Sequence, residues 1–218
     1  MAKKKSIAQA DIVEYYMDYV LIHNHNPKSV YAFAKDNNFD EQKFYEHFAS
    51  FEALEQSIFK IFFDNAHSVL EKSEEYQTFD ARNKLLSFYY TFFEILTANR
   101  SYVVHALDSH KNSLKSLKVL TQLKKQFVNY IGHLNIKTID LQQEQLTKIQ
   151  NRSLKESAWL QLLITMKFWL NDTSASFEKT DLFIEKSVRA SFDLIDTTPY
   201  KSLIDLGKFL YKEKMHMN

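Results

Sequence analysis

Glycine and proline are almost absent from this sequence, and their scarcity limits the folds that it can adopt. The 218 residues include only two glycines, Gly132 and Gly207, and two prolines, Pro27 and Pro199, whereas average usage is about 7% and about 5%. β-Sandwiches, barrels and hairpins need these residues in closely spaced turns, and phosphate-binding loops need clustered glycines. The sequence therefore predicts an all-α protein without P-loop or Rossmann chemistry.

Several functional classes are excluded by what the sequence lacks. Cysteine is absent, which removes disulfides, thiolate metal sites and cysteine nucleophiles. No stretch approaches the roughly 20 apolar residues of a membrane helix, and no signal-like apolar segment follows the N-terminal lysines. The net charge is +1 at pH 7, so binding to nucleic acid would need a local patch. We expect a cytoplasmic protein without membrane insertion and without a metal or other cofactor.

The first part of the chain reads as four helices. Apolar spacing predicts a helix over residues 6–22, two short helices over 28–37 and 40–48, and a long helix from Ser50 to about Lys72. The Asn37-Asn38 pair separates the two short helices, and Asp40 and Ser50 are good N-caps. The polar segment 73–79 is interpreted as the end of the long helix.

A larger helical block follows. Its aromatic content is unusual, since the chain holds 18 Phe and 12 Tyr, and this favours a thick core or a lined cavity. The segment 137–152 is either a mobile connection or a solvent-facing helix. Further helices are predicted over 80–97, within 101–135 with a bend near 108–112, and over 153–170, 180–195 and 200–214.

Two short helices around a tight turn, with one helix before them and a long one after, form the arrangement of a helix-turn-helix. The runs 29–34 (Ser-Val-Tyr-Ala-Phe-Ala) and 44–54 (Phe-Tyr-Glu-His-Phe-Ala-Ser-Phe-Glu-Ala-Leu) resemble the N-terminal head of TetR-family transcriptional regulators. The resemblance implies a DNA-binding head over residues 1–50 and a helical effector-binding and dimerisation domain over 51–218. It also implies a regulator rather than an enzyme, and no catalytic motif is recognisable.

The head departs from the family pattern at several positions. Asn38 stands in place of a turn glycine and Asp40 in place of a serine cap, while Gln42-Lys43 replaces Gly-Thr and Phe51 replaces a phosphate-contacting lysine. Residues 1–60 carry seven lysines against nine carboxylates, so DNA binding is expected to be electrostatically weak. The resemblance assigns DNA contacts to Lys3, Lys4, Lys5, Lys28, Ser29, Gln42, Lys43, Tyr45 and His47.

The resemblance also implies an apolar or amphipathic small ligand in the body and a homodimer formed by late helices. The residues expected to line the ligand site are Phe88, Tyr89, Phe92, Phe93, Leu96, Phe127, Tyr130 and Phe168. Those expected at the dimer interface are Trp159, Leu162, Leu163, Met166, Trp169, Phe183, Ile184, Val188 and Phe192.

An alternative function remains open. The run 169–184 resembles a segment of ubiquinone-biosynthesis accessory proteins, which have a TetR-like fold but bind lipid rather than DNA. Its Thr180 is interpreted as a helix cap. Together with the acidic head, this keeps a lipid-binding, hydrophobe-binding or partner-binding protein without DNA binding as the second hypothesis.

Overall fold

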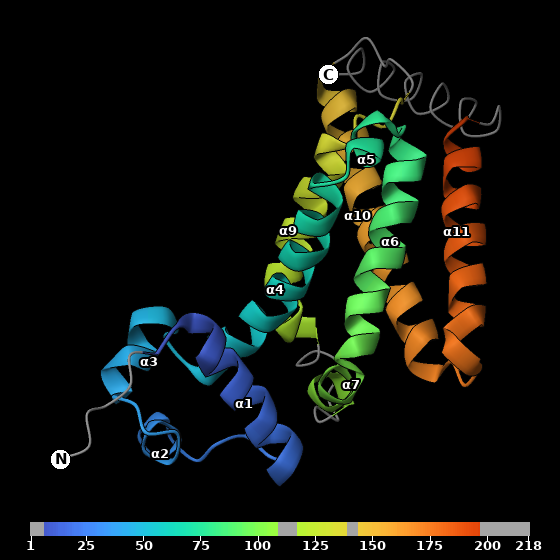
Figure 1. Cartoon of the computed structure of the whole chain (residues 1–218). Coiled ribbons are helices and arrows are strands. Elements are labelled where there is room, and N and C mark those ends of the chain that lie inside the picture. Colours follow the sequence, from blue (N-terminus) through green and yellow to red (C-terminus); the bar gives the residue numbers. More distant parts are fainter. Residues whose placement is uncertain (1–6, 109–116, 139–143, 197–218) are drawn as a thin grey trace, which may run out of the picture. The chain divides into compact units, whose positions relative to one another are not determined.

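The computed structural model describes residues 7–108, 117–138 and 144–196, and the described residues form helices joined by short turns, with no strand among them (Figure 1). This confirms the all-α prediction. Among these residues no helix is both long and apolar enough to cross a membrane.

The chain divides into two compact units. The first comprises Met1–Ser68 with Phe92–Gln126, and the second comprises Val69–Thr91 with Phe127–Asn218. The head expected over residues 1–50 therefore falls inside the first unit, which also takes in the first part of the following helix and a later segment.

The first unit begins with four helices, as the sequence predicts. They are α1 (Gln9–His23), α2 (Val30–Asp36), α3 (Glu41–His47) and α4 (Phe51–Glu71), and α7 (Arg100–Asp108) packs on α1 in the same unit.

Local signals set the ends of these helices. The Ser29 hydroxyl accepts the Ala32 amide at 3.1 Å and caps α2, and the Ser50 hydroxyl accepts the Ala53 amide at 3.2 Å at the start of α4. Asn38 adopts the left-handed conformation, with φ 56°, so an asparagine serves where a glycine is usual. The tight turn between α2 and α3 is thereby confirmed.

Phe33 of α2 is fully buried and organises the core of the first unit. Its ring lies 5.7 Å from Phe39, 6.3 Å from Phe44 and 5.6 Å from Phe51, each in an edge-to-face arrangement. Edge-to-face pairs are favoured by the ring quadrupole. One aromatic side chain thus fixes α2 against the turn, α3 and the start of α4.

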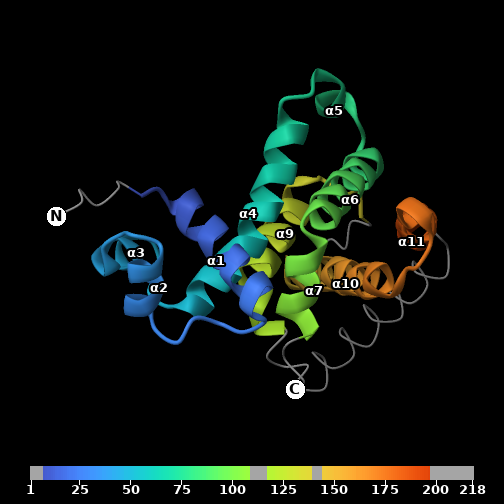
Figure 2. The ribbon, with the colours of Figure 1, turned by 60° about the horizontal axis from the view of Figure 1, so that its bottom comes forward.

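The second unit is built around a long helical hairpin. Helix α10 (Glu144–Asn171) and helix α11 (Glu178–Asp196) lie side by side and antiparallel, joined through the 3₁₀ turn η1 (Ala175–Phe177) (Figures 1 and 2). The unit also contains α5 (Glu74–Thr78) and parts of α6 (Ala81–Ala98) and α9 (Thr121–His133).

Two details differ from the sequence prediction, and a third decides between two alternatives. Segment 73–79 does not prolong the long helix, because the Ser73 hydroxyl accepts the Tyr76 amide at 3.3 Å and starts the separate helix α5. Helix α10 begins at Glu144, so much of 137–152 is helical, and the helix is the one of the two predicted alternatives that the structure supports. Thr180 lies inside α11 rather than at its cap. The segments 109–112 and 200–214 lie outside the described residues.

Candidate functional site

Helices α2 and α3 and the turn between them place the expected DNA-contacting side chains on the surface of the head. Gln42, Tyr45 and His47 of α3 are exposed, and Lys43 is half-buried. Lys28 and Ser29 are exposed just before α2. The expected contacts of Lys3, Lys4 and Lys5 lie outside the described residues.

Two polar side chains of α3 interact with acidic side chains of the same helix. The Lys43 ammonium lies 2.9 Å from both carboxylate oxygens of Glu46, and the Tyr45 hydroxyl lies 3.5 Å from the Glu41 carboxylate. Each carboxylate is one helical turn from its partner, where side chains of a helix meet. The charge of Lys43, which is expected to contact DNA, is therefore neutralised within α3 itself.

The aromatic residues expected around a ligand are nearly all buried. In the second unit Phe88, Tyr89, Phe127 and Tyr130 form one ring cluster, in which the Phe88 ring lies 5.6 Å from Phe127 and 4.9 Å from Tyr130. Phe92, Phe93 and Leu96 are also buried and fall in the first unit. Rings packed this closely form a core, and a ligand could enter the cluster only by displacing them.

Tyrosine hydroxyls give this cluster a polar end. Tyr130 donates to the Lys84 carbonyl at 3.1 Å, and its hydroxyl lies 2.9 Å from that of Tyr76. Burial is the main cause that raises the pKa of Tyr130 and of Tyr89 above the usual tyrosine range. Both phenols therefore stay protonated, and that of Tyr130 acts as a hydrogen-bonding group.

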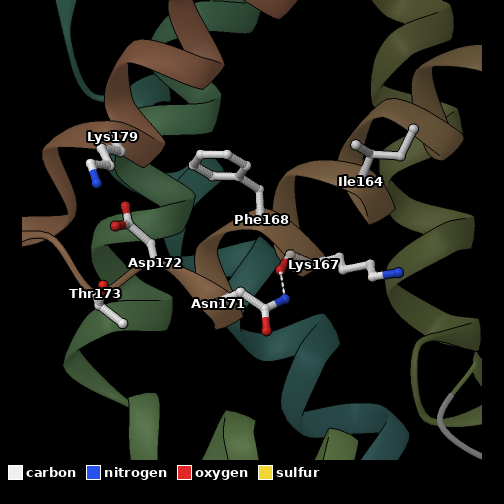
Figure 3. A pocket seen from close by; sticks show the side chains of 7 residues that line it. All are labelled: Ile164, Lys167, Phe168, Asn171, Asp172, Thr173 and Lys179. Atoms are coloured by element: carbon white, nitrogen blue, oxygen red, sulfur yellow. Dashed lines mark hydrogen bonds between the residues drawn. The ribbon is translucent and has the colours of Figure 1, made fainter.

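Phe168 lies apart from the cluster, at an open pocket of about 360 Å³ near the end of α10 (Figure 3). Ile164 and Phe168 form its apolar side, and Lys167 and Lys179 carry its positive charge. The Phe168 ring stacks on Phe183 of α11 at 4.6 Å. Of the eight residues expected at a ligand site, Phe168 is the one that is exposed.

Most residues expected at a dimer interface are buried within the chain itself. A side chain buried in its own protomer offers no surface to a partner, so these six stabilise the second unit: Trp159, Leu162, Met166, Trp169, Ile184 and Val188. Leu163, Phe183 and Phe192 are half-buried. The apolar surface that α10 leaves open is formed instead by Leu160, Ile164 and Phe168, spaced one turn apart.

Asp172 is a buried carboxylate that the sequence analysis did not single out. It accepts the amide and hydroxyl of Ser174 at 2.8 and 2.6 Å, and the amide and hydroxyl of Thr180 at 2.9 and 2.7 Å. The hydrogen bonds, first the one from the Ser174 hydroxyl, hold the pKa of Asp172 well below its usual range. The Asp-x-Ser spacing is the local signal that favours a turn here, but it does not indicate that the same carboxylate also binds Thr180.

A second buried carboxylate lies in the first unit, just after the head. Glu55 of α4 accepts the Tyr16 hydroxyl at 2.5 Å and the Asn26 amide group at 2.9 Å. These partners lie 39 and 29 residues away along the chain, so no local pattern pointed to them. The two bonds tie α1 and the segment after it to the start of α4.

Neither carboxylate forms part of a metal site, since the described residues contain no group of three or more His, Asp or Glu side chains that could hold an ion. Among the described residues, the candidate functional features are therefore exposed surfaces and packed cores, not a metal centre.

Comparison with known proteins identifies the helical body. A family model described as "Tetracyclin repressor-like, C-terminal domain" matches residues 84–210. No curated protein matches the sequence. The matched segment is more than half of the chain, and the chain therefore belongs to the tetracycline repressor-like (TetR) family.

Proposed function

We propose that the protein is a cytoplasmic transcriptional regulator that binds DNA as a homodimer through α2 and α3 and responds to an apolar or amphipathic small ligand. In this proposal Gln42, Lys43 and Tyr45 face the major groove, while Lys28, Ser29 and His47, with Lys3, Lys4 and Lys5, contact phosphates. The protein is not an enzyme.

The observation that carries the proposal is the form of the head. Helices α2 and α3 are both seven residues long and are joined by a turn through left-handed Asn38. The exposed side chains of α3 are long and polar, as groove recognition requires. The family membership of the body supports the same function.

The Lys43–Glu46 pair allows a specific test of the proposed DNA binding. DNA from upstream of the protein's own gene is titrated with full-length protein at low and moderate salt. Lys43→Ala is expected to weaken specific binding about tenfold, because one contact in the major groove is lost, and to reduce the salt slope by about 1, because one cation is removed from the DNA interface. Glu46→Gln is expected to strengthen binding, because it removes a repulsive charge and releases Lys43.

Two exposed residues of the second unit supply matched controls. Lys72→Ala and Glu74→Gln change the charge by the same amounts outside the head, and both are expected to bind DNA like the wild type. Absence of specific binding in the wild type at every salt concentration would overturn the proposal.

The acidity of the head favours a second candidate function. Over residues 7–60 four lysines face nine carboxylates, and Lys43 is paired within its own helix. In this alternative the fold binds a lipid or another hydrophobe, or a protein partner, and does not bind DNA. Undetectable DNA binding by both the wild type and Glu46→Gln would favour it, since Lys43 would then make no contact with DNA even when released from Glu46.

A further inference from the structure

A groove of about 690 Å³ runs along the first unit between α1 and α4. Val13 and Met17 of α1 and Ile61 of α4 form its apolar floor. The lining positions of α1 recur three and four residues apart, and so do those of α4, so each helix contributes one continuous face. The groove is therefore a product of how these two helices meet.

Two carboxylates on the rim of the groove have no oppositely charged partner among the described residues. Glu14 and Asp18 are exposed, lie one turn apart on α1, and form no ion pair with any described residue. Among the described lining residues, Lys60 is the one cation, and it is already bound by Asp64 on the same helix. The groove thus presents net negative charge above an apolar floor.

Ser57 adds a buried polar group to this lining. It is 8% exposed, and its hydroxyl makes no hydrogen bond to another residue in the part of the chain that the structure describes. Because the hydroxyl lines the open groove and is not enclosed by protein, it can form a hydrogen bond with a group that enters the groove.

We propose that this groove binds an organic cation with an apolar body, such as an alkylammonium compound. The cationic group lies between Glu14 and Asp18, and the apolar body covers Val13, Met17 and Ile61. A polar atom of the ligand satisfies the Ser57 hydroxyl where the ligand has one. The volume lies within the range of about 300–1,000 Å³ that is usual for small-molecule sites.

The test uses octyltrimethylammonium, with neutral octanol and anionic octanoate as ligands of the same chain length. Each is titrated calorimetrically into the full-length protein without DNA, so the result is independent of the proposed regulator function. Octyltrimethylammonium is expected to bind, more weakly as salt rises, and octanoate is expected not to bind. Equal affinity for octanol and octyltrimethylammonium would overturn the proposal, because the carboxylates would then contribute nothing.

Charge-matched variants locate the site. Glu14→Gln combined with Asp18→Asn is expected to weaken binding about tenfold, since two exposed ion pairs are lost. Glu52→Gln combined with Asp36→Asn removes the same charge from exposed positions of the first unit outside the groove, and is expected to bind like the wild type. An equal loss in both double variants would also overturn the proposal.

Methionine methyl resonances give an independent readout of the position. Met17 lines the groove and is half-buried, whereas Met166 is 2% exposed in the second unit. With ¹³C-methyl methionine, octyltrimethylammonium is expected to shift the Met17 signal, assigned through Met17→Leu, and to leave Met166 in place. A shift confined to Met166 would place the ligand elsewhere and contradict the proposal.

Discussion

The Asp172 carboxylate accepts both the amide and the hydroxyl of Thr180, at 2.9 and 2.7 Å. Asp172 follows the last residue of α10, and Thr180 lies in the first turn of α11. Because Asp172 also holds Ser174, one carboxylate fixes the whole connection between the two long helices. The negative charge is further favoured by its place at the N-terminus of α11.

Asp172→Asn is expected to lower the melting temperature by several degrees, because an amide group replaces a carboxylate oxygen where donors converge. Thermal unfolding followed by circular dichroism measures the effect. Glu185→Gln, an exposed carboxyl change on α11, serves as the control and is expected to leave the melting temperature nearly unchanged. Equal melting of Asp172→Asn and wild type would contradict the assigned role.

The Asp172 carboxylate also predicts how the stability of the fold depends on pH. The pKa of Asp172 is lowered in the folded state, so its stabilising contribution is complete above the unfolded-state value of about 4 and is lost as the pH falls through the folded value. The wild type is therefore expected to lose more stability than Asp172→Asn between about pH 4 and pH 2. Parallel stability profiles in this window would refute the prediction.

Tyr16→Phe tests the buried bond to Glu55. The ring packing is retained while Glu55 loses its 2.5 Å donor, so a loss of about 1.5–3 kcal/mol in the free energy of unfolding is expected. Urea unfolding of the full chain provides the measurement. Tyr15→Phe is the matched control, since Tyr15 is half-buried and its hydroxyl bonds to no described residue, and a change within about 0.5 kcal/mol is expected there.

Tyr102→Phe is expected not to lower the free energy of unfolding, in contrast to Tyr16→Phe. The Tyr102 side chain is 1% exposed, and its hydroxyl has no hydrogen-bond partner among the described residues. Tyr102→Phe removes an unsatisfied polar group, so the free energy of unfolding is expected to stay constant or rise by up to about 1 kcal/mol. A loss as large as that of Tyr16→Phe would show that this hydroxyl has a partner.

The exposed apolar face of α10 predicts which substitution disrupts the proposed dimer. Ile164 and Leu160 are 48% and 56% exposed, so Ile164→Glu leaves the core intact but places charge at a partner surface. Sedimentation equilibrium is expected to show a shift from dimer to monomer with unchanged helix content. Ile22→Glu is the control, because Ile22 is 76% exposed and lies in the first unit. A dimer that persists in Ile164→Glu would exclude this face of α10 as the dimer interface.

Much of the secondary structure follows from short-range signals. The caps at Ser29 and Ser50 and the left-handed turn at Asn38 each involve bonds or angles within a few residues. Apolar periodicity also predicted the first four helices, because it too depends on residues a few positions apart. The prediction was wrong at residues 73–79, where the cap at Ser73 was not recognised.

The site predictions depend on more than local signals. Phe168 and Trp169 are neighbours of similar hydrophobicity, yet Phe168 is 37% exposed and Trp169 is 1% exposed, because one step along a helix turns the side chain by about 100°. Which face is covered depends on where α11 packs. Sequence periodicity could therefore select the helices of a candidate interface but not their exposed residues.

The sequence by itself determined that the chain is helical, where most helices begin and end, and that the head has the spacing of a helix-turn-helix, because these properties arise from bonds between near neighbours. Tertiary structure alone decided that Tyr16 meets Glu55 and that Glu14 and Asp18 border a groove. Contacts of this kind join distant segments, and they form only when whole helices pack against one another.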